Sequence, residues 1–184
     1  MLCALLSKRY MKIRKIVICL LVAVIQFLTA CSSNTDSAVS SQRPQVDLEK
    51  YMGKWYEIAR YENWFQKGKT KAFAEYSLRP NGKVDIKNSA YDVNGNLTSA
   101  TAVGFVPNPK DNSRLRISFF RPFYSDYLIL DVAPDYSWAL VGGESKDYLW
   151  ILARTEDIPK PTLEQILARA TALGYDTSKL IYDK

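Results

Sequence analysis

Gly53-Lys54-Trp55-Tyr56-Glu57-Ile58-Ala59-Arg60 is the most informative stretch of this sequence. A glycine stands two residues before a tryptophan, and the residues that follow have the composition of a half-alternating strand. The stretch opens a region, residues 53–154, in which strand-like runs and turn signals follow one another at regular spacing. This spacing is typical of an all-β barrel or sandwich.

Eight runs in this region have the composition and alternation of strands. They are expected at residues 55–61, 72–78, 84–90, 97–106, 114–119, 127–132, 138–141 and 148–154. Asn81-Gly82 and Asn94-Gly95 are dipeptides that form tight hairpins, and residues 120–124 are expected to be a bend. Eight antiparallel strands joined by short hairpins predict a closed up-and-down barrel, whose interior is just wide enough for one small ligand.

The hydrophobic period changes after the last of these strands. Apolar residues recur at helical spacing over residues 163–173, and Gly174 follows them as a stop signal. Thr162 and Gln165 have the spacing of a capping box, which predicts that the helix begins beside them. We therefore expect one C-terminal amphipathic helix of about 12 residues packed on the outside of the barrel. Residues 179–182 are a candidate last strand.

The N-terminal residues have the pattern of an export signal. Lys12-Ile13-Arg14-Lys15 is a positive region, and the apolar run of residues 16–28 is too short to span a membrane comfortably. Leu28-Thr29-Ala30-Cys31 resembles the lipobox of bacterial lipoproteins, in which the cysteine is lipidated and becomes the new N-terminus. A plain secretory signal followed by an incidental cysteine is the alternative. Ser32 stands where an aspartate would resemble an inner-membrane retention signal, so the same analogy indicates the outer membrane.

Three segments follow from this interpretation. Residues 1–30 are expected to be the lipoprotein signal peptide, residues 31–46 the lipidated cysteine with a flexible polar tether, and residues 47–184 the barrel domain. Cys3 and Cys19 leave with the signal peptide, so Cys31 is the lone cysteine of the mature chain and no disulfide is expected. More than one acyl chain on Cys31 would make the membrane anchor stable.

Composition argues against several classes of function. The formal net charge of +6 comes mostly from residues 1–30, because the rest of the chain has 20 Lys and Arg against 19 Asp and Glu, a net charge of +1. Such a body lacks the basic surface that nucleic-acid binding requires. The chain has no histidine, and its one mature cysteine is expected to carry lipid. These absences exclude Ser-His-Asp and Cys-His catalysis and most zinc or copper sites.

The sequence therefore predicts no enzyme, no catalytic residue, no metal site and no cofactor. A hydrolase that uses two carboxylates, such as Glu57 and Asp126, is the formal alternative, although nothing in their spacing supports it. Regular alternation from Trp55 would turn Glu57 into the barrel, where a carboxylate needs a partner or a raised pKa. Arg60 and Arg79 are candidate partners, and the sequence leaves the orientation of Glu57 open.

Three separated motifs resemble the signatures of the lipocalin family, in the form seen in bacterial and apolipoprotein D-like members. Gly53 and Trp55 match the first, Ser125-Asp126-Tyr127 is a close but imperfect match to the second, and Arg154 matches the third. In the family, this arginine packs across the tryptophan near the closed end of the barrel, where a guanidinium gains from the indole ring. The resemblance implies structural roles for Gly53, Trp55, Asp126, Tyr127 and Arg154, and a barrel that holds one apolar ligand.

The resemblance also implies where the ligand lies, against inward side chains of the upper barrel and at its open mouth. The candidate contacts are Ala59, Trp64, Phe65, Ala74, Tyr76, Ile86, Asn88, Ile117, Phe119 and Trp150. Small residues among them indicate space inside, and large ones indicate apolar walls. Plain barrel core is the alternative for each of them. Arg114, Arg116 and Arg121 could meet a phosphate or carboxylate head group, with a solvated face as the alternative.

Three functions are compatible with these features, and the first is our prediction. It is a lipid-anchored lipocalin on the periplasmic face of the bacterial outer membrane, which binds a fatty acid or lysophospholipid for storage or transport in envelope maintenance. The second is a structural or interaction lipoprotein whose barrel is plugged by its own side chains, and the third is a lipid-modifying enzyme. The expected partners are the lipid ligand and the membrane, which the acyl chains enter. Nucleic acid is not expected, and a homodimer is left open.

Overall fold

The computed structural model describes residues 43–182, and the fold is that of this part of the chain. Helix α3 (Leu48–Tyr51) is followed by eight strands. They are β1 (Gly53–Tyr61), β2 (Thr70–Leu78), β3 (Val84–Tyr91), β4 (Leu97–Phe105), β5 (Arg114–Phe120), β6 (Phe123–Val132), β7 (Trp138–Gly142) and β8 (Leu149–Ala153). Helix α4 (Lys160–Ala172), the 3-10 turn η1 (Thr177–Lys179) and the short strand β9 (Leu180–Tyr182) complete the described part.

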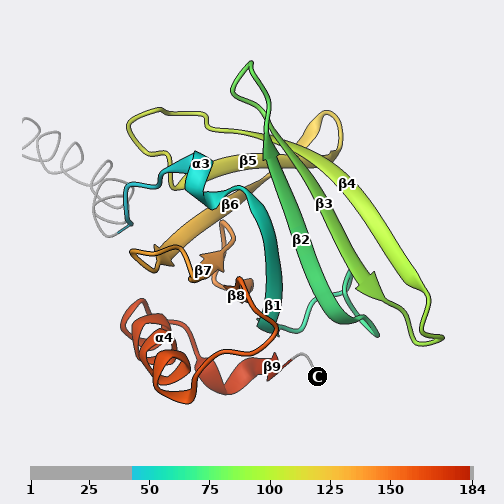
Figure 1. Cartoon of the computed structure of the whole chain (residues 1–184), viewed down its shortest axis with the longest axis vertical. Helices are drawn as coiled ribbons and strands as arrows, with labels where there is room; N and C mark the ends of the chain where they lie inside the picture. The colour runs from blue at the N-terminus through green and yellow to red at the C-terminus, as the bar shows by residue number, and fades with distance from the viewer. Residues whose placement is uncertain (1–42, 183–184) are drawn as a thin grey trace, which may run out of the picture. The chain divides into compact units, whose positions relative to one another are not determined.

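The eight strands form a closed barrel. Each strand pairs antiparallel with the next, and β8 pairs with β1. Because β1 pairs with both β2 and β8, the sheet closes into the up-and-down barrel that the sequence predicts (Figure 1). Strand β9 pairs with the end of β1, residues 59–61, so the predicted last strand is also confirmed.

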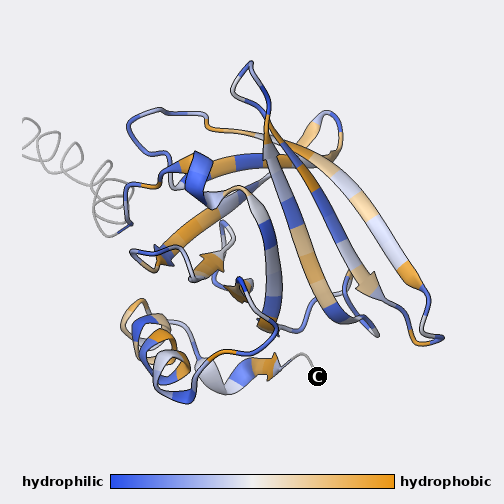
Figure 2. Ribbon diagram, in the orientation of Figure 1, coloured by the Kyte–Doolittle hydropathy of each residue, from blue (hydrophilic) through white to orange (hydrophobic). Residues whose placement is uncertain are grey.

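Alternation along the strands divides the apolar side chains between two clusters. One cluster lies inside the barrel and includes Trp55 and Ile86. The other lies between the outside of the wall and helix α4, and it includes Ile151 from β8 and Ile166 and Ala170 from the helix. Orange and blue bands alternate along several strands in Figure 2, as expected where one face of the wall is apolar and the other polar. The helix therefore packs on the outside of the barrel, as expected, and leaves the interior to the strands.

Helix α4 begins earlier than the sequence predicts. Pro159 flanks its N-terminus, and no side chain caps the helix there, so the predicted capping box of Thr162 and Gln165 is wrong. Pro161 in the first turn favours the earlier start, because proline presets a helical φ and needs no hydrogen bond at its nitrogen. The predicted stop is confirmed, since Gly174 has a φ of +81°, which glycine adopts without strain.

Strand β6 also begins earlier than predicted. Phe120 of β5 already pairs with Phe123 of β6, so the bend predicted over residues 120–124 is a tight turn at residues 121–122. The hydrophobic pattern does not indicate this start, because Phe123 and Ser125 are exposed. The buried apolar residues of β6 come later in the strand.

The two ends of the barrel differ. Connections alternate between the ends of an up-and-down barrel, so the β2–β3, β4–β5 and β6–β7 connections share one end with helix α3. Tyr51 of α3 packs against Trp55 inside the barrel and closes this end. The β1–β2, β3–β4, β5–β6 and β7–β8 connections surround the opposite end, which is the open end of the barrel (Figure 1).

Candidate ligand-binding site

Trp55 and Arg154 hold the closed end together. The Arg154 guanidinium lies 3.7 Å from the centroid of the Trp55 ring and donates a 2.8 Å hydrogen bond to the backbone oxygen of Lys54. Trp55 is fully buried, and its Nε1 donates to the backbone oxygen of Tyr51 at 2.8 Å. Gly53 has a φ of +95°, and a Cβ there would lie 3.3 Å from Arg154 Nη1. Both the backbone and the arginine therefore favour glycine at this position.

Three tyrosine hydroxyls meet above this closed end. Tyr76 donates to Tyr127 at 3.0 Å, and the Tyr51 and Tyr127 hydroxyls are hydrogen-bonded at 2.6 Å. Burial raises the pKa of Tyr76 to about 12, and it holds the pKa values of Tyr51 and Tyr127 well above the ordinary value. The three rings occupy the closed half of the barrel, so their hydroxyls form the floor beneath the open half.

We expect the three tyrosines to resist ionisation while the protein is folded. An unfolded tyrosine has a pKa near 10, so between about pH 10 and 12 the unfolded chain loses protons that the folded chain retains. Their contribution to stability is therefore complete below the unfolded-state pKa and is lost as the pH rises through the folded-state values. A spectrophotometric titration should show these hydroxyls ionising together with unfolding. Ionisation of every tyrosine of residues 31–184 near pH 10 with the fold intact would contradict this.

The half of the barrel toward the open end is a cup. Cross-strand pairing defines two successive inward rows, Tyr76 with Ile86 and Ala102, and then Ala74 with Asn88 and Ala100. The first row is buried, whereas Asn88 and Ala100 of the second row are exposed. An inward side chain is exposed only where the barrel interior is open to solvent. The cup therefore begins at the second row, above the tyrosine floor.

Most of the predicted ligand contacts lie in this cup or at its mouth. Ala74, Tyr76, Ile86, Asn88 and Ile117 are on the inward face of β2, β3 and β5. Trp150 packs against the interior cluster and stacks on Tyr148, and Phe119 is partly exposed near the end of β5. Trp64 and Phe65 lie in the β1–β2 loop at the open end, where the Phe65 ring is 6.5 Å from that of Trp150. Contact of these side chains with a ligand stays a prediction.

Ala59 does not face the cup. A bulge between Glu57 and Ala59 shifts the register of β1 against β8, so Ala59 pairs with Ile151 and packs in the cluster beneath helix α4. The prediction assumed regular alternation from Trp55 and is wrong at this position. Beyond the bulge, Arg60 pairs with Trp150 and takes the inward position instead.

A buried ion pair lies where the bulge turns Arg60 inward. Arg60 Nη1 donates to Glu57 Oε1 at 2.6 Å, and the two side chains are only 7% and 5% exposed. Gln66 of the β1–β2 loop joins them, because its Nε2 donates to Glu57 Oε2 at 2.7 Å and its Oε1 accepts from Trp150 Nε1 at 3.0 Å. This network fastens the loop to the wall of the cup. The sequence offered Arg60 as a partner for Glu57 but missed Gln66, because a loop glutamine belongs to no periodic pattern.

Asp126 and its arginines lie on the outer wall. Its buried carboxylate is 2.6 Å from Arg114 Nη2 and 3.3 Å from Arg116 Nε. These residues alternate with Leu115 and Tyr127, which belong to the interior of the barrel. Asp126 therefore joins β5 to β6, and neither Arg114 nor Arg116 faces a head group in the cup.

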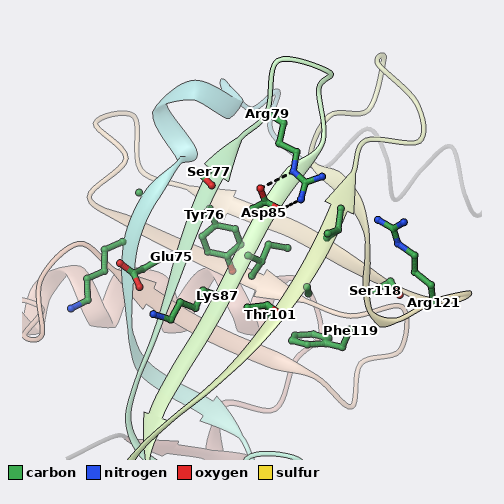
Figure 3. A pocket seen from close by; sticks show the side chains of 15 residues that line it. Glu75, Tyr76, Ser77, Arg79, Asp85, Lys87, Thr101, Ser118, Phe119 and Arg121 are labelled. Atoms are coloured by element: carbon green, nitrogen blue, oxygen red, sulfur yellow. Dashed lines mark hydrogen bonds and ion pairs between the residues drawn. The ribbon is translucent and has the colours of Figure 1, made fainter.

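A hollow of about 790 Å³ lies along β2, β3 and β4 (Figure 3). Residues of both faces of the wall line it, among them Tyr76 and Ile86 of the interior and Phe119, a predicted ligand contact. Its lining includes exposed polar residues that alternate with the inward rows, such as Glu75, Lys87 and Thr101. The Arg79–Asp85 ion pair crosses it, with Arg79 Nε 2.7 Å from Asp85 Oδ2, so Arg79 is not the partner of Glu57. Charges of both signs make this surface unsuited to an apolar ligand, and the cup is the candidate site.

Comparison with known proteins agrees with this architecture. A family model described as a lipocalin-like domain matches residues 46–184. The chain belongs to the lipocalin family. Membership supports the coarse function of an outer-membrane lipoprotein that binds a small hydrophobic ligand.

Bacterial relatives cover nearly the whole of this lipocalin. It is 37% identical over 158 residues to outer membrane lipoprotein Blc of Citrobacter freundii, which covers 85% of this chain and 89% of the relative. It is 36% identical to the protein of the same name from Escherichia coli K12, over 84% and 88% of the two chains. Temperature-induced lipocalin-1 of Arabidopsis thaliana is 36% identical over 73% and 77%. The bacterial relatives support localisation of this lipocalin to the outer membrane through a lipid anchor.

Solved structures share the fold of this lipocalin. Apocrustacyanin C2 superposes with a TM-score of 0.64 at 22% identity, over 83% of this chain and 87% of the other. Insecticyanin from the tobacco hornworm Manduca sexta superposes with a TM-score of 0.61 at 21% identity, over 78% and 82%. At these identities the likeness concerns the fold, a closed barrel followed by a C-terminal helix.

Residues 43–182 of the lipocalin contain neither a cluster of metal-ligating side chains nor a membrane-spanning helix. No group of three or more His, Cys, Asp or Glu side chains in this range could hold a metal ion. No helix in the same range is long and apolar enough to cross a membrane. The predicted signal peptide and Cys31 lie outside the described residues.

Proposed function

We propose that this lipocalin is a lipid-anchored carrier of the outer membrane that holds the acyl chain of a fatty acid or lysophospholipid in its cup. Storage or transport of such a lipid would serve envelope maintenance. The observation that carries the proposal is the inward row above a closed tyrosine floor, in which Asn88 and Ala100 are exposed beside the buried Ala74. The small side chains of Ala74 and Ala100 leave space on the β2 and β4 side of this row, while Trp55, which pairs with Ala74 from β1, is an aromatic wall beside them.

A polar group stands beside the cup where the head of an acyl lipid would lie. The Glu57–Arg60 pair is neutral overall, and Arg60 Nε has no acceptor among residues 43–182. This N–H is enclosed by protein, so the position of the ion pair next to Trp150, and not a free donor, favours the polar end of a lipid here. This supports a lipid whose chain points to the floor and whose polar end points to the mouth.

The anchor is part of the same proposal. Residues 1–30 would be removed as a signal peptide, Cys31 would carry the acyl chains, residues 31–46 would form the tether, and the barrel domain of residues 47–184 would face the periplasm. The lipobox pattern and the bacterial relatives named outer membrane lipoproteins support this arrangement. The proposed role is binding and not catalysis, because no histidine or free thiol is available for nucleophilic or general-base chemistry.

Neighbouring residues of β4 provide the test. Ala100 faces the cup and Thr101 faces outward, and both are exposed. In A100F, the new ring would displace about three methylenes of the acyl chain at about 0.8 kcal/mol each, which weakens binding roughly 50-fold. T101F adds the same ring to the outside and should bind like the unmodified protein. Binding is measured by quenching of tryptophan emission with fatty acid or lysophospholipid, and by native mass spectrometry of co-purified lipid.

A second candidate function is supported by the tyrosine cluster, which fills the closed half of the barrel with protein side chains. An interaction lipoprotein with a plugged barrel would bind neither lipid and would carry none after purification. Absence of lipid binding in A100F, T101F and the unmodified protein alike would favour this candidate. A homodimer also stays a prediction, and sedimentation of the unmodified protein tests it.

A further inference from the structure

The open end of the barrel carries nearly all of the exposed large apolar side chains. Of eleven such side chains among residues 43–182, all but Leu78 belong to the open-end connections, the strand ends beside them, or β9, which pairs with the open end of β1. We define the apolar rim as Trp64, Phe65, Val93, Leu97, Phe120 and Phe123. Four of these, Trp64, Val93, Phe120 and Phe123, are between 77% and 83% exposed.

This concentration differs from the ordinary scatter of apolar residues on a surface. Single exposed apolar side chains are common, whereas a contiguous apolar patch marks a contact with a protein, ligand or membrane. The rim side chains come from three separate connections, β1–β2, β3–β4 and β5–β6, which are far apart in sequence and share only their position at the open end. The β1–β2 and β3–β4 connections lie on the same side of the barrel, at the lower right of the strands in Figure 1.

We infer that the apolar rim docks on a lipid bilayer, with the mouth of the cup facing the acyl chains. Trp and Phe are side chains that favour the membrane interface or the hydrocarbon beneath it. Lys67 and Arg121 stand in the same connections, where they can meet anionic head groups. A docked mouth would give an acyl chain a path between bilayer and cup that does not cross water.

The length of the tether makes the bilayer the favoured occupant. Arg43 is fixed near the closed end by hydrogen bonds to Asp111 and Ser113 of the β4–β5 connection. Eleven residues separate Arg43 from Cys31, and they span up to about 37 Å when extended. A nine-residue strand such as β2 rises about 30 Å. The anchor of the proposed function, on which this inference rests, therefore keeps the open end within reach of its own bilayer and raises the local concentration of that surface.

Tryptophan quenching by brominated lipids tests the docking. The lipidated full-length mature chain is reconstituted in vesicles of phosphatidylethanolamine and phosphatidylglycerol with or without bromine on the acyl chains. We expect brominated acyl chains to quench the emission of Trp64. In W64F, the part of the tryptophan emission that is quenched in the unmodified protein should be absent. The variant F120S/F123S, which changes two exposed side chains and no predicted ligand contact, should lose most of the quenching with an unchanged melting temperature.

Three outcomes distinguish docking of the apolar rim on the bilayer from lipid binding in the cup and from dimer formation. If A100F loses lipid binding but retains the Trp64 quenching, docking holds as a property distinct from the cup. Absence of Trp64 quenching in the anchored protein overturns the inference, even if the cup binds lipid. If Trp64 were shielded from the brominated lipid only at high protein concentration, where a dimer also forms, the apolar rim would be the contact with a second copy of the chain. This outcome would also overturn the inference.

Discussion

Replacing Trp55 by alanine should lower the free energy of unfolding by about 4 kcal/mol, the usual cost of removing a large aromatic side chain from a closed core. Trp55 is fully buried, and its ring contacts Tyr51 from α3 and the Arg154 guanidinium. Its loss leaves a cavity at the floor of the barrel and removes the surface on which Arg154 lies. Most domains are stable by only 5–15 kcal/mol, so W55A should unfold at a far lower urea concentration.

Trp64 provides the matched control, because it lies nine residues later and is 83% exposed. W64A should change the free energy of unfolding by less than about 0.5 kcal/mol, as surface substitutions usually do. Urea denaturation followed by circular dichroism reports both variants with the same probe. Equal midpoints for W55A and W64A would show that the tryptophan of the first signature does not hold the closed end.

Arg60→Met should cost about 3–5 kcal/mol, since it leaves the Glu57 carboxylate buried without its cation. The two side chains are almost completely buried, and Glu57 is otherwise tied to Gln66 of the β1–β2 loop. We expect the lower stability to appear as a lower midpoint of urea denaturation. We also expect the β1–β2 loop to become more mobile, which faster hydrogen exchange at its backbone amides would reveal.

The double variant Glu57→Leu with Arg60→Met removes both charges and should recover most of this loss, because two apolar side chains of similar volume pack without a desolvation penalty. Arg79→Met is the control, since the Arg79–Asp85 pair is solvent-exposed and should contribute little to the midpoint. If the double variant were as unstable as Arg60→Met alone, the loss would come from packing and not from an unpaired charge.

The strands could be predicted because their signals are local. Asn81-Gly82 and Asn94-Gly95 specify tight turns from two adjacent residues, and the alternation of Leu115 and Ile117 with Arg114 and Arg116 specifies a face from its own neighbours. The two largest boundary errors also have local causes. The start of α4 follows Pro159 and Pro161 and not the box of Thr162 and Gln165, and the start of β6 is exposed.

The candidate site could be predicted only in part. The inward positions of β2 and β3, such as Ala74 and Asn88, followed from alternation because these strands pair without a shift over that stretch. Ala59 was misplaced because a bulge shifts β1 against β8, and the need for that bulge arises only when the barrel closes. Gln66 was missed because its importance lies in reaching Glu57 and Trp150 from a loop.

The sequence by itself determined the class of the fold, because alternation and turn dipeptides are local signals. The closed end built on Gly53, Trp55 and Arg154 followed from the resemblance to the lipocalin signatures, and the signal peptide of residues 1–30 stays a prediction. Only the tertiary structure decided that Arg60 is the buried partner of Glu57, and that ten exposed apolar side chains gather at the open end. Both depend on which strands become neighbours when β8 pairs with β1, and pairing between residues distant in the chain leaves no mark in a local pattern.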